Sequence, residues 1–78
     1  MKLNEIEDYL KKFLLTEGME EEDVQNMDIT IGELGLTSIE RMKIAVALKK
    51  KFGYMPKIAN NDEITLVQIC QQVFEHAQ

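Results

Sequence analysis

Three segments of the chain place apolar residues three and four positions apart, which is the spacing of one face of an α-helix. The first runs from residue 4 to Gly18, the second from Thr37 to Phe52, and the third from Thr65 to the end of the chain. No segment alternates apolar and polar residues as a half-buried strand does. The pattern predicts a single all-α domain over residues 1–78, a small four-helix bundle with three main helices, one short helix and a long first loop.

Capping residues mark where these helices begin. Asn4 is the predicted N-cap of the first helix. The other two helices open with a capping box, in which an N-cap hydroxyl and a side chain three residues later each accept a hydrogen bond from the other's backbone N–H. The two boxes are Thr37 with Glu40, and Thr65 with Gln68. We therefore expect well-defined starts for both helices, with Gly53 and Pro56 ending the second one.

The segment between the first two helices, residues 19–37, has no helical period and contains two glycines. It is predicted to be a long loop with room for one short turn of helix. Its expected apolar anchors are Val24, Met27, Ile29, Ile31 and Leu34. Asn60–Glu63 is predicted to form a further short turn before the last helix.

Composition excludes several classes of site. Cys70 is the single cysteine and His76 the single histidine, so neither an internal disulfide nor a Cys/His zinc cage is expected, and no metal site is predicted. The longest apolar run, residues 44–48, is too short to cross a bilayer, and the acidic N-terminus does not match a signal peptide. We expect a cytoplasmic protein without a membrane span.

The charge is distributed unevenly. The net charge is −5, yet residues 41–57 contain no acid and six cations. These are Arg41, Lys43, Lys49, Lys50, Lys51 and Lys57. The negative total is the wrong sign for a nucleic-acid-binding domain. Lysines in the last turn of a helix complement its dipole, but Arg41 and Lys43 lie earlier and have no acid near them in this segment, which favours a surface for a protein partner.

The second helix carries two apolar stripes where a surface helix normally has one. Ile44, Ala45, Leu48 and Phe52 form the expected core face. Ile39, Met42 and Val46 line up on the other side, between lysines. This second stripe is either covered by a loop or exposed as a binding surface. The candidate partner-binding residues are Thr37, Ile39, Met42, Lys43, Val46, Lys49 and Lys50.

Residues 33–53, ELGLTSIERMKIAVALKKKFG, resemble the signature of acyl and peptidyl carrier proteins. That signature has an acidic residue, Leu, Gly, an apolar residue, usually Asp, then the modified Ser and another apolar residue, followed by a helix ending in Phe. The order of helices along the chain is also similar, including a short third helix before the last one. The resemblance implies a carrier rather than an enzyme. Ser38 would carry 4′-phosphopantetheine, taken from coenzyme A through a phosphodiester, whose thiol holds an acyl or aminoacyl group as a thioester.

Two departures from the family shape the expectation. Thr37 stands where the family usually has Asp, and the helix that follows is basic where acyl carriers of fatty acid synthesis are typically acidic. Since like charges repel, the expected partners are a phosphopantetheinyl transferase and acyl-loading and acyl-processing enzymes with acidic or neutral docking patches. Gly35-Leu36 replaces the Gly-Gly of many peptidyl carriers, which favours acyl cargo of a fatty-acid-like or polyketide-like pathway. A peptidyl carrier of a non-ribosomal pathway and an unmodified interaction domain are the alternatives.

Overall fold

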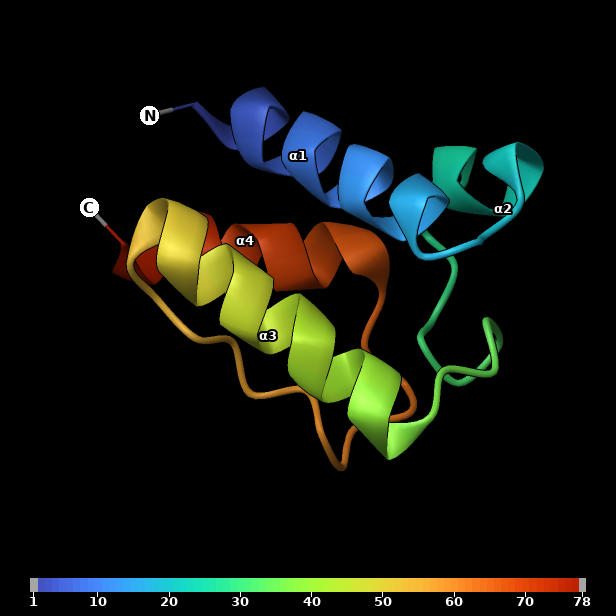
Figure 1. Cartoon of the computed structure of the whole chain (residues 1–78). Helices are drawn as coiled ribbons and strands as arrows, with labels where there is room; N and C mark the ends of the chain where they lie inside the picture. Colours follow the sequence, from blue (N-terminus) through green and yellow to red (C-terminus); the bar gives the residue numbers. More distant parts are fainter. Residues whose placement is uncertain (1, 78) are drawn as a thin grey trace.

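Four helices account for the regular structure of residues 2–77, which are the residues that the computed structural model describes (Figure 1). They are α1 (Leu3–Thr16), α2 (Glu21–Gln25), α3 (Ser38–Phe52) and α4 (Leu66–His76). The prediction of a small all-α bundle with three main helices and one short helix is confirmed.

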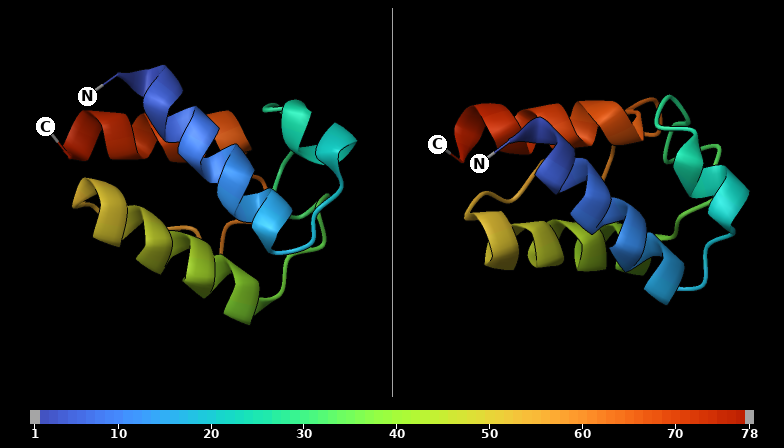
Figure 2. Two further views of the ribbon diagram at one scale, coloured as in Figure 1. Left: turned by 45° about the horizontal axis from the view of Figure 1, so that its top comes forward. Right: turned by 90° about the horizontal axis from the view of Figure 1, so that it is seen from above.

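The first helix holds the bundle together, since α1 contacts each of the other three helices. It crosses obliquely over α3 and α4 (Figure 2). Both α3 and α4 begin at the end of the molecule where α1 finishes, and they run in the same direction (Figures 1 and 2). The starts of α3 and α4, with their capping boxes, therefore share one end of the fold.

The helices bury the faces that their periodicity predicts. On α3, Ile44, Ala45 and Leu48 are at most 5% exposed, and Phe52 packs half-buried against the same core. The apolar stripe of α4 is buried in the same core and consists of Leu66, Ile69, Cys70 and Val73. Among residues 2–77 no polar or charged residue is buried, so the core is entirely apolar and its stability comes from packing.

The start of α1 differs from the prediction. Its N-cap is Lys2, and Asn4 lies inside the helix. The backbone N–H of Lys2 donates to the carboxylate of Glu5 at 3.2 Å. The reciprocal half of a capping box is thus enough to set the start here, because it satisfies one of the N–H groups that a helix end leaves unpaired. Gly18 follows the end of α1 with φ of 98°, in the left-handed region, as predicted for a C-terminal glycine.

The long first loop contains the short helix. Within residues 19–37, α2 turns Val24 into the core, and Ile31 is also fully buried. The segment before α4 has no helix, so the short third helix implied by the family resemblance is not present there. Residues 60–63 form turns, as their composition predicts. Within these turns, the backbone carbonyl of Asp62 accepts a hydrogen bond from Gly32 N–H in the first loop.

Backbone hydrogen bonds join the two loops to each other. Thr30 and Thr65 form an isolated antiparallel bridge. Four flanking bonds extend the pairing: Ile31 N–H to Ile64 C=O at 3.0 Å, Gly32 N–H to Asp62 C=O at 3.0 Å, Leu66 N–H to Ile29 C=O at 3.1 Å, and Val67 N–H to Met27 C=O at 2.9 Å. A Cβ at Gly32 would lie 2.7 Å from the Asp62 carbonyl oxygen, so this close approach requires glycine. We call this contact the loop pairing.

The same change, Ile to Ala, should affect stability strongly on the buried face of α3 and weakly on its exposed face. Ile44→Ala should lower the free energy of unfolding by about 2–5 kcal/mol, because Ile44 is 1% exposed and its removal leaves a cavity. Ile39→Ala on the same helix should change that free energy by no more than about 0.5 kcal/mol, because Ile39 is 71% exposed. Urea unfolding of both variants measures the difference. Equal losses would mean that Ile39 is covered.

Candidate functional site

Ser38 is the single serine of the 78-residue chain and the first residue of α3. It is exposed. The predicted capping box lies beside it: the Thr37 hydroxyl accepts from Glu40 N–H at 3.2 Å, and Thr37 N–H donates to the Glu40 carboxylate at 2.8 Å. This exchange fixes the first turn of α3 and leaves the Ser38 side chain outside the cap.

The turn before α3 is also held in place. The Thr30 hydroxyl and the Glu33 carboxylate lie 3.1 Å apart, and the backbone N–H of each residue donates to the side chain of the other. Gly35 adopts a φ of 71°, in the region that favours glycine. Leu36 then enters the core at 5% exposure. The chain therefore reaches Ser38 from a closed turn anchored in the core.

The N-terminus of α3 suits an anionic group. The N–H groups of Ser38 and Ile39 have no acceptor within residues 2–77, since the cap satisfies only Glu40 N–H. Unpaired N–H groups and the helix dipole favour negative charge at this end. The Glu40 carboxylate is held by Thr37 N–H. A phosphodiester on the Ser38 hydroxyl therefore fits the chemistry of this helix end.

A groove of about 680 Å³ starts at Ser38 and runs between α1 and α3. Its α3 side is formed by Ser38, Ile39, Met42, Lys43, Val46, Ala47 and Lys50. Its α1 side is formed by Tyr9 and Phe13, with Glu17 just beyond the helix. We call it the α1/α3 groove. Its lining is mainly apolar, with two lysines and one carboxylate, so it can bind an apolar chain or an apolar face of a partner.

The second apolar stripe of α3 lines this groove and is not covered. Ile39 is 71% exposed and Met42 56%, while Val46 is half-buried. The alternative in which a loop covers the stripe is therefore wrong. The loop pairing holds residues 27–32 against residues 62–67 instead, which leaves this side of α3 open.

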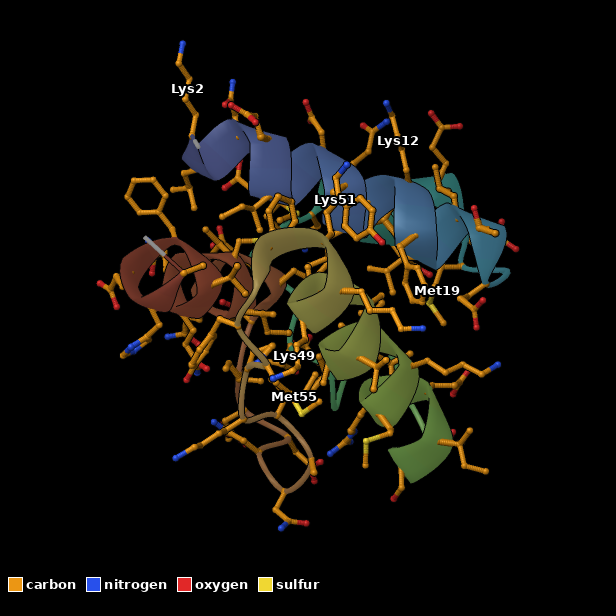
Figure 3. All side chains as sticks on the ribbon, turned by 60° about the vertical axis from the view of Figure 1, so that its left-hand side comes forward. Lys2, Lys12, Met19, Lys49, Lys51 and Met55 are labelled. Carbon is orange, nitrogen blue, oxygen red and sulfur yellow. The ribbon has the colours of Figure 1, made fainter. Side chains whose placement is uncertain are left out.

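The structure brings most of the predicted site residues together. Five predicted partner-binding residues line the α1/α3 groove beside Ser38: Ile39, Met42, Lys43, Val46 and Lys50. Two do not. Thr37 serves as the N-cap, and Lys49 follows Ala45 by four residues on the side of α3 that faces the segment around Met55 (Figure 3). Lys49 thus borders the apolar stripe from the side opposite α1.

Acids that are distant in the sequence reach two of the cations of residues 41–57. Arg41, whose side chain is 12% exposed, pairs with Asp62 at 2.7 Å and donates to the carbonyls of Leu36 and Ala59, each at 3.1 Å. Lys43 lies 3.3 Å from Glu17. The expectation that both lack a nearby acid is therefore wrong, and Arg41 joins α3 to the segment before α4 rather than forming part of a free basic surface.

The aromatic wall of the groove was not predicted. Tyr9 and Phe13 belong to the apolar stripe of the first helix, whose centre, Leu10, is buried, whereas they lie half-buried at its edge. Tyr9 meets the ring of Phe52 edge-on at 5.5 Å, and the Lys51 ammonium lies 5.9 Å from the Tyr9 ring centre. The sequence signal that could have predicted this wall is the position of Tyr9 and Phe13 at the edge of the apolar stripe of the first helix.

The single histidine, His76, lies at the end of α4, whereas Ser38 lies at the start of α3. His76 stacks on Tyr54 at 4.7 Å near the end of α4. No group of three or more metal-ligating side chains occurs within residues 2–77. Across the same residues, no helix has both the length and the apolar character needed to cross a membrane.

Comparison of the chain with family models, with curated proteins and with solved structures gives no match. The likeness of residues 33–53 to carrier proteins therefore stays an expectation from the sequence pattern alone.

The capping box predicts an acid-sensitive start of α3. The hydrogen bonds from the backbone and then the side chain of Thr37 hold the pKa of Glu40 below its ordinary value. The ionised cap therefore contributes stability above the pKa of Glu40 in the unfolded chain, and this contribution is lost as the pH falls through the lower folded-state pKa. A carboxyl NMR titration should give a lowered pKa for Glu40. An ordinary value would mean that the box is not formed in solution.

Cys70 predicts the thiol chemistry of the folded chain. Burial raises the pKa of Cys70 to about 12, so almost no thiolate is present at pH 8. The native protein should react with iodoacetamide much more slowly than the same protein unfolded in guanidinium chloride. Mass spectrometry of the alkylated chain measures both rates. Similar rates would mean that α4 opens readily.

Proposed function

We propose that this chain is a carrier domain in which Ser38 takes 4′-phosphopantetheine from coenzyme A. The observation that carries the proposal is the position of Ser38, an exposed hydroxyl at the N-terminus of α3 and at one end of an apolar groove. When bound, the group supplies a thiol on a flexible arm that holds an acyl cargo as a thioester. The chain itself contributes attachment and docking, and the proposal assigns it no enzymatic activity.

Each residue near the site has a role in this proposal. The Ser38 oxygen loses its proton and bonds to the phosphorus that carries the pantetheine arm of coenzyme A, while the pyrophosphate P–O bond breaks and adenosine 3′,5′-bisphosphate leaves. The N–H groups of Ser38 and Ile39 face the resulting negative charge. The box of Thr37 and Glu40 keeps the first turn of α3 in place while partners bind and leave.

The proposed partners act at the same face of the domain. They are a phosphopantetheinyl transferase and acyl-loading and acyl-processing enzymes with acidic or neutral docking patches, in a cytoplasmic lipid or polyketide pathway. The basic α3 supports this choice, because an enzyme with a basic docking patch would be repelled. A peptidyl or aminoacyl carrier would use the same Ser38, so this cargo class stays an alternative.

An unmodified protein-interaction domain is the second candidate function. It is favoured by the open α1/α3 groove together with Thr37, which replaces the acid that transferases usually meet before the serine. In that case Ser38 would be dispensable and the groove alone would carry the function.

Intact-protein mass distinguishes the two candidates. After incubation with coenzyme A and a broad-specificity transferase, the mass should rise by one phosphopantetheinyl group. Ser38→Ala should show no increase, and because the chain has no other serine, this control is unambiguous. Thr37→Asp should be modified at least as fast, since Asp also caps helices.

Failure would also be informative. No mass increase with several transferases for the natural sequence, but a full increase for Thr37→Asp, would mean that Thr37 has removed the recognition site. No increase for either would overturn the carrier proposal and leave the interaction domain.

A further inference from the structure

The exposed stripe of α3 has lysines on both borders. At about 100° per residue, Ile39, Met42 and Val46 span one side of the helix. Lys43 and Lys50 border this stripe on the α1 side and line the groove, and Lys49 borders it on the other side. We call these six residues the lysine-bordered stripe.

The apolar part of the stripe is unusually open. Ile39 and Met42 are the most exposed large apolar side chains within residues 2–77, at 71% and 56%. Large apolar groups that protrude beside a groove gain free energy when a partner removes them from water, at roughly 25 cal/mol per Å². A shallow trough with protruding side chains fits a protein surface better than a small enclosed ligand.

The borders of the stripe are positive although the chain carries a net charge of −5. Within residues 2–77, Lys49 and Lys50 have no carboxylate within ion-pairing distance. Lys43 is paired with Glu17, but its side chain is 56% exposed and such pairs contribute less than about 1 kcal/mol. Lys43 can therefore exchange Glu17 for the carboxylate of a partner.

We propose that the lysine-bordered stripe binds an acidic amphipathic helix of a partner protein. The apolar row of that helix lies along Ile39, Met42 and Val46, and its Asp or Glu residues on the two flanks meet the lysines. Lys43 and Lys50 are seven residues apart on one face of α3, a rise of about 10 Å. The matching acids on a partner helix are therefore seven residues apart as well.

A second copy of the chain does not supply this chemistry. Its two acidic helices, α1 and α2, turn their apolar rows into the core, where Ile6, Leu10, Leu14 and Val24 are at most 1% exposed. They therefore offer carboxylates without an open apolar row beside them. The occupant with both features is a different protein.

This inference deepens the proposed function, since it names the partner chemistry for the surface beside Ser38. The contact itself does not require Ser38 to be modified, so it can be tested on the unmodified chain. Modification of Ser38 without peptide binding would remove only the docking inference. Peptide binding without modification would remove only the carrier proposal.

Two synthetic helical peptides with the same apolar row test the inference. One has Glu on both flanks with a seven-residue spacing, and the other has Lys at the same positions. Fluorescence anisotropy at low salt should give at least about tenfold tighter binding of the Glu peptide. Its affinity should fall as salt is added, because exposed ion pairs are screened.

A pair of charge reversals locates the contact. Lys50→Glu should weaken binding of the Glu peptide about tenfold and strengthen binding of the Lys peptide. Lys12→Glu makes the same charge change on α1, where the side chain extends away from α3 (Figure 3), and should leave both affinities nearly unchanged. Ile39→Ala should weaken the binding of both peptides, because both use the apolar contact that this substitution removes.

Three results would overturn the inference. Equal affinity for the two peptides would mean that the lysines do not select the partner. Equal effects of Lys12→Glu and Lys50→Glu on affinity would mean that the preference for the Glu peptide comes from the net charge of the domain and not from the stripe. A dimer in sedimentation velocity that Ile39→Ala abolishes would make a second copy the occupant.

Discussion

The loop pairing between residues 27–32 and 62–67 is the contact on which the candidate site depends. The helices α3 and α4 run in the same direction, so the connection between them must return along the molecule to the end where α1 finishes and both helices begin. The pairing satisfies backbone groups of both connections with each other, at the end where both helices begin. Ile31 and Ile64, which belong to the paired segments, are buried in the core and anchor the loop pairing there. Arg41 then ties the first turns of α3 to the same segment through Asp62 and Ala59. The position of Ser38 thus follows from contacts made far from it in the sequence.

The same arrangement explains why one side of α3 stays open. A helix packed on a small core buries one face, and here that face is Ile44, Ala45 and Leu48. The first loop would have to cross the opposite side to cover Ile39 and Met42. The loop pairing holds it against the segment before α4 instead, and α1 crosses α3 obliquely, so only part of the stripe meets the wall of Tyr9 and Phe13. The groove is therefore a consequence of how the helices pack.

Local signals predicted much of the fold. Periodicity gave the three main helices, and the reciprocal hydrogen bonds of Thr37 with Glu40 and Thr65 with Gln68 gave two of their starts. Asn4 is not the cap because the Glu5 carboxylate accepts from the backbone N–H of Lys2, which starts the helix two residues earlier. The pairs of Arg41 with Asp62 and Lys43 with Glu17 were out of reach, because both join residues about 20 or more positions apart, which no local spacing rule describes. The groove needed the same long-range information, although most of its α3 side was predicted from the second stripe.

Attachment and docking on one helix have a mechanical consequence for the proposed carrier. A partner that binds the lysine-bordered stripe is held at a set distance from Ser38, because the stripe and Ser38 belong to one continuous helix. The tethered cargo is then presented at high effective concentration without any further contact. The charges are compatible with this, since Lys43 lies about 7–8 Å along the helix axis from Ser38, and Lys49 and Lys50 lie beyond it. The ammonium group of Lys43 lies between an anion on Ser38 and the carboxylates that meet Lys49 and Lys50, which lessens their mutual repulsion.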